Sequence, residues 1–110
     1  MRVNIVVSDT RIATAELGEY HYQRFLQWAF VQRQSKAAFA RNVLVSRTDA
    51  NSEGIDQGLE FYAARYGMTV AQLQQRIAEL DNEKRSISQI HIALEKELSE
   101  ASGLLPSEES

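Results

Sequence analysis

The chain has 110 residues, of which 44% are hydrophobic, and a formal net charge of -3 at pH 7. That length is enough for one domain with a modest core. No run approaches the roughly 18 apolar residues that a membrane span requires, and the N-terminus lacks the apolar core of a signal peptide, so we expect a cytoplasmic protein. The absence of cysteine excludes disulfides and thiolate metal sites.

The charge is unevenly divided along the chain. Residues 1–50 contain seven Lys or Arg and four Asp or Glu, whereas the remaining sixty residues contain five basic and eleven acidic side chains. Such an asymmetry indicates two halves with different partners.

Residues 1–7 alternate as a β-strand does. At a period of two, one face carries Val3, Ile5 and Val7, and the other carries Arg2, Asn4 and Val6. A lone strand leaves its backbone groups unpaired, and the rest of the chain offers no second good strand. The sequence therefore predicts that this strand pairs with the same strand of a second copy, which makes the protein a homodimer or a higher homo-oligomer.

Helical spacing begins at Glu19, and the apolar stripe of this first helix consists of Tyr22, Phe25, Leu26, Ala29 and Phe30. Ser35 is a good N-cap for a second helix that runs from Lys36 to about Arg47. The polar residues 48–54 fit either a loop before a new helix or a solvated turn within one long helix.

The remaining residues continue at helical spacing. Ile55 to Tyr66 form a third helix that a left-handed Gly67 ends, and Thr69 caps the helix that follows. This last helix has a heptad repeat, which predicts a coiled coil either between chains or folded back on the preceding helices. The predicted seam consists of Val70, Leu73, Ile77, Leu80, Lys84, Ile87, His91, Leu94 and Leu98.

The order of strand, helix, short turn and helix within residues 2–47 resembles the ribbon-helix-helix DNA-binding family. The resemblance implies a dimer whose paired strands enter the major groove of DNA. Base-edge contacts would come from Arg2, Asn4 and Val6, since arginine suits guanine and asparagine suits adenine.

The same resemblance implies phosphate contacts at the start of the second helix. The residues implied are Ser35 and Lys36, with Arg33 and Arg41. The sequence departs from the family in a leader from Thr10 to Gly18 and in a turn that lacks glycine.

Residues 61–73 also look like a helix-turn-helix, although Ile77 falls one place late for the usual pattern. In that interpretation the residues near the groove would be Thr69, Gln72, Gln74 and Gln75. The alternative is an ordinary helical hairpin with a glycine stop and a threonine cap.

No catalytic constellation, glycine-rich phosphate loop or metal-ligand spacing is evident, so we expect a non-enzymatic protein without a cofactor or a metal. The predicted fold class is mainly α, with one N-terminal strand paired across a ribbon-helix-helix dimer and a C-terminal coiled-coil helix. The predicted divisions are a ribbon-helix-helix-like dimerisation and DNA-binding domain at 1–50, a helical hairpin or coiled-coil extension at 51–101 and a disordered tail at 102–110.

The expected function is a sequence-specific regulator that binds duplex DNA, such as a repressor or an antitoxin-like, plasmid or phage regulator. The alternative is a protein-interaction module, for example a phage-encoded inhibitor or an assembly adaptor, acting through the acidic C-terminal helices.

Overall fold

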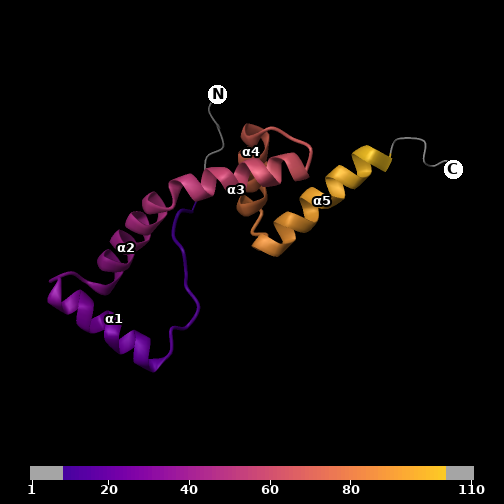
Figure 1. Ribbon diagram of the computed structural model, residues 1–110. Helices are drawn as coiled ribbons and strands as arrows, with labels where there is room; N and C mark the ends of the chain where they lie inside the picture. The colour runs from indigo at the N-terminus through magenta and orange to yellow at the C-terminus, as the bar shows by residue number, and fades with distance from the viewer. Residues whose placement is uncertain (1–8, 104–110) are drawn as a thin grey trace. The chain divides into compact units, whose positions relative to one another are not determined.

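The computed structural model describes residues 9–103, which form five α-helices (Figure 1). The helices are, in chain order, α1 (Glu19–Val31), α2 (Lys36–Ala50), α3 (Ser52–Arg65), α4 (Val70–Asn82) and α5 (Ile87–Gly103). Residues 9–103 contain no strand, so this part of the chain is all-α.

The predicted fold class, a ribbon-helix-helix with a coiled-coil extension, is therefore wrong. The predicted strand at residues 1–7 lies outside the described residues. In the described part, helical spacing, side-chain caps and left-handed turns account for the structure, and no element has a period of two. Helical periodicity over long segments is a stronger indicator of fold class than a short alternation.

The chain divides into two compact units, and the division falls within α3 between Gly54 and Ile55. Residues 11–54 form one unit, which contains the α1–α2 hairpin. Residues 55–103, together with residues 9 and 10, form the other, which contains most of α3 and all of α4 and α5.

The turns α1–α2, α3–α4 and α4–α5 have the same backbone design. Each preceding helix is followed by a residue of positive φ, which is 58° at Arg33, 70° at Gly67 and 68° at Lys84. The N–H of the next residue donates to the carbonyl five residues earlier, as Met68 does to Ala63 at 2.9 Å. This is the Schellman arrangement, which satisfies carbonyls that the end of a helix leaves without a partner.

The following helix begins in the same way at each turn. The residue two places after the left-handed one is an N-cap, which is Ser35, Thr69 or Ser86, and its hydroxyl accepts the N–H three residues later at 3.1 to 3.2 Å. Buried side chains ten residues apart flank each turn, and these pairs are Ala29 and Phe39, Ala63 and Leu73, and Leu80 and Ile90. We call this eleven-residue arrangement the helical corner.

The core of residues 55–103 lies among α3, α4 and α5. Leu73, Leu80 and Leu94 are each 1% exposed, and they cluster with Ala63, Tyr66 and Ile90. Apolar side chains packed around this cluster are Leu59, Met68, Val70, Ile77 and Ala93.

The predicted single coiled-coil helix from Val70 to Leu98 is instead two helices. The chain leaves α4 after Asn82, passes through the left-handed Lys84 and enters α5 at Ile87. On either side of this corner, Leu73 and Leu80 of α4 and Leu94 of α5 belong to one core, but the seam is broken between them. Seam position Lys84 consequently lies in the turn, and seam position Ile87 is 69% exposed.

The polar stretch 48–54 is helical except at Asn51. The Asn51 side chain donates from Nδ2 to the carbonyl of Arg47 at 2.7 Å, and the Asn51 N–H donates to the same oxygen at 3.1 Å. The stretch is therefore neither a loop of several residues nor part of one unbroken helix, because α2 ends at Ala50 and a new helix begins at Ser52.

Candidate nucleic-acid interface

The α1–α2 hairpin carries basic but almost no acidic side chains. Residues 20–48 include five Arg or Lys and no Asp or Glu, although the whole chain has 15 acidic residues. Glu19 and Asp49 mark the two ends of this acid-free segment. The hairpin therefore presents a positive electrostatic potential, which favours anionic partners.

The start of α2 concentrates this positive potential. Ser35 Oγ accepts the N–H of Ala38 at 3.1 Å, and no acidic residue lies in the first turn. Helix geometry leaves the N–H groups of Lys36 and Ala37 without intrahelical acceptors, and the helix dipole adds partial positive charge at this end.

The Lys36 side chain is held by the other helix of the hairpin. Its Nζ donates to the Tyr22 hydroxyl and lies 4.8 Å from the centroid of the Tyr22 ring. The hydroxyl of Tyr22 therefore restrains the ammonium from the opposite helix.

The residues predicted to contact phosphate are all exposed. Arg33, Ser35 and Lys36 lie together in the α1–α2 corner, and Arg41 follows in α2. Arg41 Nη1 donates to Asn42 Oδ1 at 3.0 Å. The structure thus groups three of these four residues at one end of the hairpin, while their role remains a prediction.

The residues predicted to read base edges, Arg2, Asn4 and Val6, lie outside the described residues. In the alternative helix-turn-helix, three of the four proposed groove residues make hydrogen bonds within the protein. Thr69 and Gln72 form a reciprocal capping box. Gln75 donates to Glu79 at 3.1 Å. The corner at Gly67 is repeated at Arg33 and Lys84, so its geometry is not specific to a DNA-reading motif.

The hairpin buries very little of its apolar surface. Only Ala29 and Phe39 are buried among residues 11–54. The Phe39 ring stacks on Phe25 at 5.3 Å and meets Trp28 edge-on at 4.6 Å between ring centroids. The exposed large apolar side chains of the two helices are Tyr20, Tyr22, Leu26, Trp28, Phe30, Val31, Leu44 and Val45.

Two helices with so small a shared core have little to offset the conformational entropy of folding. An exposed apolar surface of this extent is typical of a protein interface. The hairpin therefore favours association with another protein surface.

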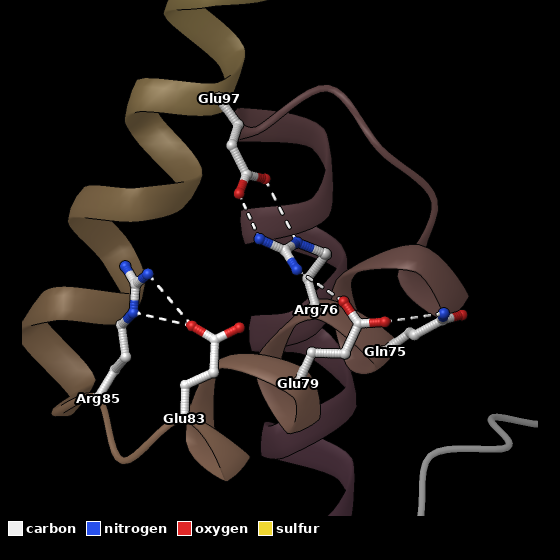
Figure 2. A network of polar contacts seen from close by, with 6 residues as sticks. All are labelled: Gln75, Arg76, Glu79, Glu83, Arg85 and Glu97. Carbon is white, nitrogen blue, oxygen red and sulfur yellow. Dashed lines mark hydrogen bonds and ion pairs between the residues drawn. The ribbon is translucent and has the colours of Figure 1, made fainter.

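The second unit differs in charge and in its polar contacts. Residues 55–103 contain eight acidic and five basic side chains. Figure 2 shows the Arg76 guanidinium between two carboxylates, those of Glu97 from α5 and Glu79 from α4. Arg76 Nη1 lies 2.6 Å from Glu79 Oε1, and two guanidinium nitrogens donate to Glu97.

These contacts shift the titration of both partners. Hydrogen bonds from Arg76 and then from Gln75 lower the pKa of Glu79, and the bonds to Glu97 and Glu79 raise the pKa of Arg76. The network ties α4 to α5, and two carboxylates already surround the single positive charge of Arg76. Arg76 is therefore a poor candidate for binding an external anion.

Acidification is expected to weaken the fold through Glu79. The pKa of Glu79 is lower in the folded than in the unfolded chain. Its contribution to the free energy of unfolding is therefore fully present above the unfolded-state pKa, and it is lost as the pH falls through the folded-state pKa. Urea unfolding between pH 6 and pH 3 should show this loss. Glu79→Gln should flatten the dependence, whereas the charge-matched control Glu60→Gln should keep it; equal profiles for the two variants would contradict the assignment.

His91, a predicted seam residue, has a polar partner that the sequence did not reveal. Its Nδ1 lies 2.7 Å from the hydroxyl of the buried Tyr66, and the Tyr62 ring lies 5.0 Å away between centroids. Tyr62 belongs to α3, Tyr66 directly follows that helix, and His91 belongs to α5, 25 residues after Tyr66. The contact accounts for a polar side chain beside the core.

None of the helices in residues 9–103 is both long enough and apolar enough to cross a bilayer. Within the same residues, no three His, Asp or Glu side chains gather as metal ligands. Comparisons with protein-family models, curated proteins and solved structures found no match. The class that the structure defines is a helical protein with a basic hairpin, free of acidic residues from 20 to 48, and an acidic three-helix unit.

Proposed function

We propose that this protein is a non-enzymatic DNA-binding regulator that acts as a homodimer. The observation that carries the proposal is the acid-free segment 20–48 of the hairpin, in which Arg33 and Lys36 lie at the positive end of α2. Protein–DNA affinity depends strongly on neutralising phosphates with Lys and Arg, and helix N-termini are frequent phosphate ligands.

Two copies of the chain would associate through their hairpins, because the hairpin leaves most of its apolar side chains exposed. Phe30 is 80% exposed and Trp28 is 50% exposed. A second copy of the hairpin supplies a surface of the same apolar character. It also doubles the number of basic groups that face one duplex, which raises the affinity for DNA.

The second candidate function is a protein-interaction module without nucleic acid. The acidic unit favours it, since residues 55–103 carry a net negative charge and expose Phe61, Ile87 and Ile92. In this case the partner would be a protein with a basic surface that receives the acidic helices.

Salt titration of DNA binding separates the two functions. Binding of the purified protein to random duplex DNA, followed by fluorescence anisotropy, should weaken steeply with salt if phosphate contacts dominate. Lys36→Gln should reduce the slope of log affinity against log salt by about 0.9, the value for one lost phosphate contact. The matched control is Lys96→Gln, which makes the same change in charge on an exposed residue of α5 and should leave the slope unchanged.

Two results would overturn the DNA proposal. One is the absence of DNA binding at low salt, which would favour the protein-interaction module. The other is an equal loss of slope in both variants, because it would show that net charge alone, and not the start of α2, governs binding.

A further inference from the structure

We infer that Tyr22 is a positioning residue that holds the Lys36 ammonium in place for a DNA phosphate. This inference rests on the proposed DNA-binding function and assigns a role to a residue that the sequence analysis placed only in an apolar stripe. Tyr22 itself does not need to touch DNA for this role.

The contact joins the two helices of the hairpin across 14 positions in sequence. The Tyr22 hydroxyl accepts one N–H of the ammonium, and the ring lies 4.8 Å from Nζ. An ammonium has three N–H donors, so two stay available for phosphate oxygens. Both side chains are exposed, which leaves the ammonium accessible from solvent.

Other basic side chains of the hairpin are held differently. Arg24 donates to Gln27 at 2.8 Å, and Arg41 donates to its neighbour Asn42, so each bonds within its own helix. Lys36 is instead held from α1 while its backbone N–H lies in the first turn of α2. The Lys36 ammonium is therefore the one of these three basic groups whose partner lies on the other helix of the hairpin.

The physical benefit is preorganisation. A free lysine side chain loses considerable rotamer freedom when it is fixed by a ligand. A lysine that is already restrained by Tyr22 loses less, so its phosphate contact contributes more to the affinity.

A double-mutant cycle tests this role. DNA affinity at one low salt concentration would be measured for the wild type, Tyr22→Phe, Lys36→Gln and the double variant. Tyr22→Phe removes the hydroxyl and keeps the ring, and it should weaken binding about two- to tenfold, as expected for one restrained side chain. In the Lys36→Gln background, the same change should have no effect.

Tyr20→Phe is the matched control, since Tyr20 lies on the same helix, is 70% exposed and contacts the His21 ring. It should leave DNA affinity unchanged, and thermal unfolding should be similar for all variants. Equal effects of Tyr22→Phe in both backgrounds, or no effect in the wild type, would overturn the inference. If the wild type itself fails to bind DNA, the proposed function fails first, so the two failures are distinguishable.

Discussion

Replacing Leu94 with alanine is expected to destabilise the residue 55–103 unit by about 2–5 kcal/mol, whereas Ile87→Ala should cost less than about 1 kcal/mol. Both residues occupy the same heptad position and belong to α5. Leu94 is 1% exposed within the core, but Ile87 is 69% exposed at the start of the helix. The cost of truncation depends on the packing that is lost, so the two variants should differ strongly.

Urea unfolding followed by circular dichroism measures the difference. A lower midpoint for Leu94→Ala with an unchanged slope would show a loss of stability without a change in the unfolding reaction. Similar costs at both positions would contradict the α4–α5 corner, because a continuous coiled coil would bury Leu94 and Ile87 alike.

Alanine at Gly67 is expected to destabilise the same unit by about 1–2 kcal/mol, the usual cost of placing a side chain in the left-handed region. Gly67 has a φ of 70°, and an added Cβ would lie 3.2 Å from Leu98 Cδ1. The end of the leucine side chain can shift, so backbone strain should account for most of the loss.

Gly58→Ala is the matched control and should have the opposite sign. Gly58 lies inside α3, and an added Cβ there would meet nothing within 4 Å. Alanine in a helix interior is more favourable than glycine by about 0.5–1 kcal/mol. Thermal unfolding of both variants should therefore show shifts in opposite directions, and a stabilised Gly67→Ala variant would contradict the left-handed stop.

The parts of the fold that depend on local chemistry were predictable from the sequence. The starts of α1 and α2, the Ser35 and Thr69 caps and the Gly67 stop were predicted and are confirmed. Each depends on side chains within a few residues of the backbone groups that they satisfy. Such signals are legible without knowledge of the tertiary structure.

The corner at Lys84 was not predictable in the same way. Lysine is not a typical left-handed residue, and the heptad pattern continues through the turn. In retrospect, Ser86 followed by Gln89 was a capping signal, since Ser86 and Gln89 each bond the backbone N–H of the other. The heptad spacing from Val70 to Leu98 favours one continuous helix, whereas the cap formed by Ser86 and Gln89 favours a new helix that begins after Ser86.

The candidate interface was predictable only in part. Arg33, Ser35 and Lys36 are neighbours in sequence, so any short turn brings them together. The contact between Lys36 and Tyr22 depends on how α1 packs against α2, and no sequence spacing encodes it. The Arg76–Glu97 ion pair, which joins residues 21 apart, likewise required the α4–α5 hairpin.

The repeated helical corner has a consequence for how quickly the chain folds. Each corner is complete within eleven consecutive residues, so its hydrogen bonds and its pair of buried side chains form without closure of a long loop. Small proteins dominated by such local contacts fold in microseconds to milliseconds. Stopped-flow or temperature-jump refolding of this chain should therefore show a rapid main phase, with no need for a slow search among distant segments.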